Sequence, residues 1–235
     1  MSRACLLILA LLAAPAAARA QGGAGCAVAL VLAMDVSRSV DAAEFALIRN
    51  GTAAAFRDPA LRRLVESAPG GVLVTLTQWS GADQQRQSIP WRVLAGGADL
   101  DALAAEIETV KRAYRFSLTA PGNALQHAAS LFARAPLNCR RRVIDLAGDG
   151  VRNTGLPTGA IGDRLAARGI TVNGLVVRGD SPDPLAFYRS EVRRGAASFV
   201  EVATGYADFP RAMLLKLLRE LSPALSALPQ ARGPG

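Results

Sequence analysis

The segment Ala27-Val-Ala-Leu-Val-Leu-Ala-Met34, followed directly by Asp35-Val-Ser-Arg-Ser39, decides how this chain folds. A continuous apolar run of this length predicts a buried β-strand. Side chains of a strand alternate with a period of two, so an extended chain through residue 39 would point Asp35, Ser37 and Ser39 the same way. Open α/β sheets bind ligands at the carboxyl ends of such strands. The segment therefore predicts three oxygen donors at a sheet edge, which suit Mg²⁺, Mn²⁺ or Ca²⁺.

Two further segments place oxygen donors at similar points. Arg141-Arg-Val-Ile-Asp-Leu-Ala147 predicts a second strand, and Gly148-Asp-Gly150 follows it as a carboxylate in a glycine-framed turn. Thr119 lies between the two strands, on a loop that opens a helix at Pro121. Ser and Asp also cap helices, so the first motif alone leaves capping open. The three segments together favour a metal site.

This set of residues resembles the metal-ion-dependent adhesion site of von Willebrand factor A domains and integrin inserted domains. In that family two serines and a threonine are hydroxyl ligands, and two aspartates bind the ion directly or through water. The matching residues, in chain order, are Asp35, Ser37, Ser39, Thr119 and Asp149. The resemblance covers residues 26–222. Gln78-Trp-Ser-Gly81 and the segment 142–150 followed by Asn153 look closer still to a bacterial family of secreted von Willebrand A-like proteins of unknown function.

Predicted strands and helices alternate along the chain, which indicates an α/β fold. Such alternation predicts a doubly wound, mainly parallel sheet with helices on both faces. Pro90 demotes its strand to the sheet edge, where it forms an antiparallel hairpin with its neighbour. The predicted strands are 27–34, 71–79, 88–93, 141–147, 170–177 and 197–202. The predicted helices are 41–57, 99–110, 121–132, 159–168 and 207–221, with 180–194 as a polar loop or short helix. In the last helix, the predicted packing stripe is Leu214, Leu215, Leu218 and Leu221.

The two ends of the chain are expected to lie outside the domain. Residues 1–20 combine a basic Arg3, an apolar stretch broken at Pro15, and a small-x-small site ending at Ala20. This pattern is typical of a cleaved signal peptide and is too short for a stable membrane span. We expect residues 21–25 to be a linker, 26–222 the von Willebrand A-like domain and 223–235 a flexible tail. The protein is therefore expected to be periplasmic or secreted.

Export changes the interpretation of the cysteines, because Cys26 and Cys139 remain as an even pair in an oxidising compartment. Cys26 lies nine residues before Asp35, and Cys139 lies ten before Asp149. The sheet order of the resembling family places the two strands side by side, which would bring both thiols within disulfide reach. Two unrelated buried thiols, or a lipid anchor at Cys26, are the alternatives.

Charge and motif content disfavour several other functions. The formal net charge is +8, but the arginines are dispersed, without the basic stripe and interleaved aromatics of a nucleic-acid surface. The chain has neither the G-x-G-x-x-G nor the Walker A motif of nucleotide-binding proteins. His127 is the single histidine, and no G-x-S-x-G motif accompanies it, which disfavours a Ser-His-Asp hydrolase. Asp145, inside an apolar strand, is expected to be buried and paired with an arginine or with backbone donors.

The ligand set itself suggests a binding function. Three neutral hydroxyls with two nearby carboxylates leave a cation under-neutralised, with one coordination position open to an acidic side chain of a partner. We therefore expect a metal-dependent, adhesion-type interaction domain and not an enzyme. The alternatives are a metal-dependent hydrolase that uses the same oxygens and a structural domain with a vestigial site. Trp79, Ser80 and Asn153 are candidates for a partner-binding rim, although Trp79 fits the core equally well.

Overall fold

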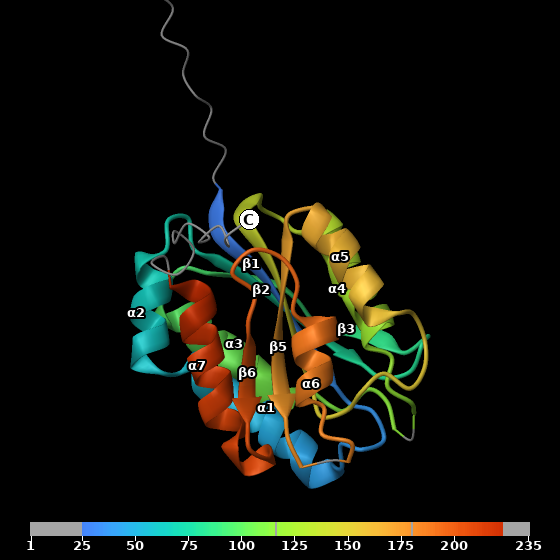
Figure 1. Ribbon diagram of the computed structural model, residues 1–235. Coiled ribbons are helices and arrows are strands. Elements are labelled where there is room, and N and C mark those ends of the chain that lie inside the picture. Colours follow the sequence, from blue (N-terminus) through green and yellow to red (C-terminus); the bar gives the residue numbers. More distant parts are fainter. Residues whose placement is uncertain (1–24, 116, 180, 223–235) are drawn as a thin grey trace, which may run out of the picture.

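The computed structural model describes residues 25–115, 117–179 and 181–222, which form a six-stranded sheet with helices on both faces (Figure 1). The strands are β1 (Cys26–Asp35), β2 (Val72–Trp79), β3 (Gln85–Leu94), β4 (Cys139–Gly148), β5 (Ile170–Val177) and β6 (Val200–Ala203). Their order is β3-β2-β1-β4-β5-β6, and neighbours are parallel except for β2 and β3. The predicted fold, including its antiparallel edge strand, is confirmed.

The helices divide between the two faces of the sheet (Figure 1). One face carries α1 (Ala42–Phe56), α2 (Pro59–Ser67), α3 (Gly97–Thr109) and α7 (Phe209–Leu221). The other carries α4 (Pro121–Leu131), α5 (Thr158–Ala167) and α6 (Leu185–Phe187), the last continuing into a π-helical turn at Tyr188–Val192. Each face buries its own core. Leu30 and Leu32 of β1 point into the first, and Val31 and Ala33 into the second, as strand alternation requires.

Helix α2 is absent from the prediction. Helix α1 ends at Phe56, one residue before the predicted boundary, and the pair Asp58-Pro59 follows it closely. The same pair also starts α2, because the Asp58 side chain accepts a hydrogen bond from Ala60 N at 2.7 Å and proline occupies the first turn. Aspartate at the N-cap with proline just after it is a favourable way to begin a helix.

The predicted leucine stripe of α7 is correct for Leu214, Leu218 and Leu221, which lie in or against the core, but it misses the charged residues of the packed face. Leu215 is 44% exposed, whereas Lys216 and Glu220 are buried. Lys216 Nζ lies 2.8 Å from Asp145 Oδ1 of β4, within ion-pair distance but outside hydrogen-bond geometry, and it donates to Glu220 of its own helix. Asn173 of β5 donates to Glu220 at 2.8 Å. Asp145 is therefore buried as expected, but its partner is a lysine and not an arginine.

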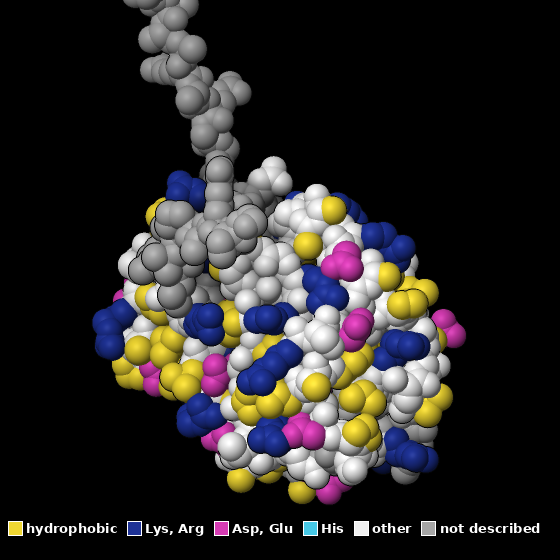
Figure 2. Space-filling model, viewed as in Figure 1, with side chains coloured by type: hydrophobic (Ala, Val, Ile, Leu, Met, Phe, Trp, Pro, Cys, Tyr) yellow, Lys and Arg dark blue, Asp and Glu magenta, His cyan; other side chains and the backbone are white. Residues whose placement is uncertain are grey.

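The disulfide prediction is confirmed at the amino-terminal edge of the sheet. The register of β1 against β4 pairs Cys26 with Cys139, and a disulfide joins them. Within the described residues, no helix has the length and apolar character needed to cross a membrane. Basic side chains are scattered among acidic and apolar ones on the face shown in Figure 2. The predicted signal peptide, most of the linker and the predicted tail lie outside the described residues.

Candidate metal centre

The segments that carry the five candidate ligands meet at the carboxyl-terminal edge of the sheet. β1 ends at Asp35 and β4 ends at Gly148, and the register of the two strands pairs Met34 with Ala147. Asp149 thus follows β4 at the same level of the sheet where the chain leaves β1. The segment there, residues 35–40, is called the first ligand loop. Thr119 reaches the same edge on the loop that precedes α4.

The first ligand loop is a turn and not a continued strand. Ser37 N donates to Asp35 Oδ1 at 2.7 Å, and Val40 N donates to Ser37 O at 3.1 Å. The hydroxyls of Ser37 and Ser39 nevertheless lie 3.3 Å apart. The expectation of an extended chain through residue 39 was wrong. The turn brings the two hydroxyls together. It also provides hydrogen-bond acceptors for the backbone N–H groups of Ser37 and Val40.

Two buried carboxylates face this hydroxyl pair. Ser39 Oγ donates to Asp149 Oδ1 at 2.9 Å, and the Tyr206 hydroxyl donates to Asp149 Oδ2 at 2.6 Å. Asp35 is 1% exposed, and its Oδ2 has no hydrogen-bond partner among the described residues. Burial, and next the charge of Asp149, raise the pKa of Asp35 to about 8. An orphaned carboxylate oxygen beside a second buried carboxylate is the environment that a cation stabilises.

Thr119 is held in place by Asn153. Thr119 N donates to Asn153 Oδ1 at 2.8 Å, and Asn153 N donates to Thr119 O at 3.1 Å. A β-carbon on Gly150 would lie 3.6 Å from the Thr119 hydroxyl, so this hydroxyl borders the turn that carries Asp149. Thr119 and Ser39 both line a cavity of about 320 Å³ over the site. A ligand in this cavity would therefore meet both hydroxyls.

Gly148 has a steric role at the end of β4. A β-carbon at this position would lie 2.6 Å from the Tyr188 hydroxyl oxygen and 2.8 Å from Asp35 Oδ2. The Tyr188 hydroxyl is buried and has no hydrogen-bond partner in the described part of the chain. Burial raises the pKa of Tyr188, so it stays protonated. The glycine before Asp149 thus makes room for one candidate ligand, Asp35, and for a tyrosine beside it.

Three residues at the site could not be identified from the sequence pattern. Tyr206 donates to Asp149, and the Tyr188 hydroxyl lies on the same side of Gly148 as the Asp35 carboxylate. Arg112 donates to the carbonyl oxygens of Val36 at 3.0 Å and Ser37 at 2.8 Å, and so fixes the first ligand loop from outside. Each reaches the site from a segment distant in the sequence, so no local spacing marks it.

The proposed rim needs correction. Trp79 is fully buried, and its indole nitrogen donates to Ala33 O at 3.1 Å. Ser80 is also buried, and its hydroxyl donates to Leu118 O at 3.1 Å. Both residues support the site from inside and cannot contact a partner at its surface. Asn153 is exposed and lines the cavity, so it does lie at the rim.

The donor set fits a hard divalent cation. Across the described residues, no three His, Cys, Asp or Glu side chains cluster as a metal site. A site here must therefore draw on hydroxyls, and oxygen-only ligands suit Mg²⁺, Mn²⁺ and Ca²⁺ better than softer ions. Two carboxylates and three hydroxyls on one sheet edge, with one carboxylate oxygen unpartnered, meet that requirement.

A family model described as "Protein of unknown function (DUF1194)" matches residues 25–225. A search of curated proteins finds no match. Several solved structures resemble the fold. Proximal thread matrix protein 1 from the mussel byssus has a TM-score of 0.63 at 14% identity, covering 82% of this chain and 47% of that one. Another structure of that protein, with a zinc-occupied MIDAS motif, has a TM-score of 0.63 at 15% identity, covering 85% and 47%.

Two bacterial structures are also similar. A von Willebrand factor type A structure from Catenulispora acidiphila has a TM-score of 0.59 at 14% identity, covering 84% of this chain and 43% of that one. BatB from Bacteroides thetaiotaomicron has a TM-score of 0.55 at 13% identity, covering 82% and 99%. This chain thus spans about half the length of the mussel and Catenulispora proteins. The likenesses show a von Willebrand A fold.

Proposed function

The chain belongs to the DUF1194 family, and we propose that it is an exported, metal-dependent protein-interaction domain of the adhesion type. The proposed ligands are Asp35, Ser37, Ser39, Thr119 and Asp149, and the proposed ion is Mg²⁺, with Mn²⁺ or Ca²⁺ as alternatives of the same oxygen chemistry. One observation carries the proposal. The buried Asp35 keeps an unpartnered oxygen near the buried Asp149, and Ser39, which donates to Asp149, lines the adjacent cavity together with Thr119. The Cys26–Cys139 disulfide supports a periplasmic or secreted location.

The chain's own residues prepare the site for an acidic group. Tyr206 and Ser39 each donate to one oxygen of Asp149, and Arg112 holds the first ligand loop by two backbone carbonyls. A bound divalent cation would supply an open coordination position beneath the cavity. At about 320 Å³ the cavity lies at the small end of ligand sites, a size that admits one side chain of a partner protein. We propose that an aspartate or glutamate of that partner enters it, and that neither nucleic acid nor nucleotide is bound.

The cavity favours binding over hydrolysis. Metal-assisted hydrolysis needs a positioned general base near the ion and the substrate. The described residues that line the cavity include Arg38, Ser39 and Asn153, but no His, Asp or Glu. A partner's carboxylate would therefore meet hydroxyls, an amide and a guanidinium, which are groups that hold an anion in place.

Titration calorimetry on the metal-free, disulfide-bonded protein tests the proposal. We expect the wild type to bind one Mg²⁺ or Mn²⁺. We expect the double variant Ser37→Ala with Ser39→Ala to bind the ion with an affinity lower by roughly 10- to 100-fold or more. The matched control is Ser67→Ala with Ser130→Ala, which removes two exposed hydroxyls elsewhere and should bind like the wild type. A wild type that binds none of Mg²⁺, Mn²⁺ and Ca²⁺ would indicate a vestigial site. Metal-dependent turnover of a simple phosphate ester would instead indicate a hydrolase.

A further inference from the structure

A strongly basic groove borders the candidate metal centre. It has a volume of about 630 Å³ and lies between the start of α1 and the segment that follows α3. Its basic residues are Arg38, Arg49, Lys111, Arg112 and Arg115. Five of its ten lining residues are thus Lys or Arg, compared with 27 of 235 in the whole chain. The groove is therefore far more basic than an arginine-rich sequence alone would make it.

Nearby carboxylates balance only part of the positive charge of this basic groove, since Glu108 interacts with Arg49 and Asp35 with Arg112. Its acidic lining residue, Asp41, is the N-cap of α1, where Oδ1 accepts from Glu44 N at 2.8 Å. The ion pairs of the described chain use Arg57, Arg62, Arg92, Arg178, Arg194, Arg211 and Lys216. None of the five groove residues takes part in them. The groove therefore carries a surplus of cations that an anionic ligand can pair.

The basic groove is continuous with the proposed metal site. Arg38 lines both the groove and the cavity over the candidate ligands. Arg112 extends from the groove to the carbonyl oxygens of Val36 and Ser37, one of which belongs to a proposed ligand residue. Its Nε is buried and has no hydrogen-bond partner among the described residues. A ligand seated on the ion could thus continue into the groove without leaving the surface.

We propose that the basic groove binds further acidic residues of the same partner segment whose carboxylate enters the metal cavity. This inference rests on the proposed function and specifies the partner as an extended acidic peptide segment that also carries apolar side chains. The apolar requirement comes from the non-basic lining of the groove, which includes the exposed Ala42 together with Val40, Phe45 and Val110. A sulfated or acidic polysaccharide would pair the cations but leave that lining uncovered. Charge complementarity of this kind favours fast association and selects against basic partners.

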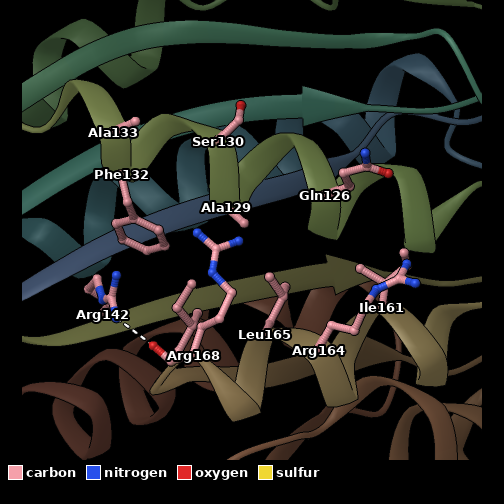
Figure 3. A pocket seen from close by; sticks show the side chains of 11 residues that line it. Gln126, Ala129, Ser130, Phe132, Ala133, Arg142, Ile161, Arg164, Leu165 and Arg168 are labelled. Carbon is pink, nitrogen blue, oxygen red and sulfur yellow. Dashed lines mark hydrogen bonds between the residues drawn. The ribbon is translucent and has the colours of Figure 1, made fainter.

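A second cavity supplies a matched control. It has a volume of about 590 Å³ and lies between α4 and α5, where Figure 3 shows Arg142, Arg164 and Arg168 around it. Arg142 donates to the carbonyl oxygen of Arg168, which ends α5. This cavity borders the starts of β4 and β5, away from the metal centre at their carboxyl ends. Charge reversals here change the net charge without touching the basic groove.

Fluorescence anisotropy with a labelled peptide of alternating Glu and Leu tests the inference. The titrations use the disulfide-bonded protein in Mg²⁺ and again in chelator. We expect the double variant Arg49→Glu with Arg115→Glu to lower the affinity for the peptide by roughly tenfold or more in both conditions. The control pair Arg164→Glu with Arg168→Glu should bind nearly as the wild type does. If both double variants lost the same peptide affinity, the effect would come from net charge alone and the inference would be overturned. The inference would also be overturned if the groove variant lost no affinity.

Two further measurements separate this inference from the metal proposal. Calorimetry with Mg²⁺ alone should give the same affinity for the groove pair as for the wild type, because neither Arg49 nor Arg115 is a proposed ligand. If the wild type bound no metal yet kept peptide binding that depends on the groove arginines in chelator, the metal proposal would fail and the groove would stand. Two results together would overturn the peptide assignment in favour of a polysaccharide. The first is that a peptide of alternating Glu and Ser binds as well as the Glu-Leu peptide. The second is that dextran sulfate displaces both peptides at a lower concentration of negative charge than the peptides themselves require.

Discussion

At the scale of single residues, the site depends on one missing side chain. Gly148 ends β4 where the Asp35 carboxylate and the Tyr188 hydroxyl share the adjacent space. Both groups are buried, and each keeps an atom without a hydrogen-bond partner among the described residues. Such atoms are costly inside a protein unless a ligand or ion completes them. The local geometry therefore favours capture of a cation at the expense of stability in its absence.

Gly148→Ala should both destabilise the metal-free protein and weaken metal binding. The new methyl group would meet Tyr188 and Asp35 at distances that force one of them to move. Overpacking of this kind costs about 1–3 kcal/mol, which urea denaturation can measure. Gly96→Ala is the control, because a β-carbon there meets nothing within 4 Å. Adding Tyr188→Phe should recover part of the loss. Equal stability of the Gly148 and Gly96 variants would contradict this account.

The residues that could be predicted are those whose role depends on local spacing. Asp35, Ser37 and Ser39 lie close together in sequence after an apolar strand, and the turns at Thr119 and Asp149 carry their own signals. Tyr206 was missed because a lone tyrosine after a short strand has no pattern, and only the fold brings it to Asp149. Ser80 was misplaced, and Trp79 stayed open between core and rim, because residues at a strand end can face either the surface or the core.

At the scale of elements, α7 is fastened to the sheet by buried charge. Lys216 and Glu220 lie on its buried face, and Lys216 meets Asp145 of β4. The leucine spacing predicted a stripe that includes the exposed Leu215, because apolar periodicity takes account of apolar residues only. It gives no sign that charged side chains are buried and paired between two elements. The cost of burying an ion is recovered only when its partners are in place. The docking of this helix therefore combines this charge cluster with buried apolar residues such as Phe209, Met213 and Leu217.

Lys216→Met should destabilise the protein by about 3–5 kcal/mol, because it leaves the Asp145 and Glu220 carboxyls buried without their cation. Lys111→Met is the natural control, since it changes the chain's other lysine, which is exposed. Thermal and urea unfolding of both variants would measure the difference. A Lys216 variant as stable as the Lys111 variant would show that the buried charges do not hold α7.

The same cluster predicts a dependence on pH. Burial is the main cause that raises the pKa of Asp145 from 3.8 to about 7, with Glu220 adding to it and Lys216 opposing it. Between these values the folded protein keeps a proton that the unfolded chain has released, so this group makes stability fall as pH rises. Asp145→Asn should remove that contribution and reduce the fall in unfolding free energy between pH 4 and 7 by at least about 1 kcal/mol. Urea unfolding in chelator measures it, and parallel slopes for both proteins would refute the prediction.

At the scale of the whole molecule, the sheet separates the disulfide from the edge that carries the candidate ligands. The disulfide closes the amino end of β1 and β4, while the candidate ligands follow their carboxyl ends. A ten-residue strand spans about 30 Å, so the two features are independent. Strand and helix alternation allowed a mainly parallel, doubly wound sheet to be predicted, whereas the adjacency of β1 and β4 was expected from the resemblance to von Willebrand A domains. The start of α2 could not be predicted, because Asp58-Pro59 serves as both an end and a beginning.

Replacing Cys26 and Cys139 with serine should therefore cost stability and leave the metal site intact. The bond closes a loop with a sequence separation of 113 residues, which the chain-entropy model values at up to about 4–5 kcal/mol. Calorimetric Mg²⁺ affinity, measured at a temperature where the variant is still folded, should match the wild type. A variant that lost its metal affinity while folded would show that the two ends of the sheet are coupled.

The most direct test of the metal-dependent account is a crystal of the wild-type protein soaked in Mn²⁺ and measured for anomalous scattering. The account predicts one strong peak at the carboxyl edge of the sheet, surrounded by oxygens of Asp35, Ser37, Ser39, Thr119 and Asp149. Bonds to the hydroxyl oxygens should be near the length of about 2.0–2.2 Å that oxygen ligands of small divalent cations show. A well-ordered site with no anomalous peak, or a peak bound to other residues, would contradict it.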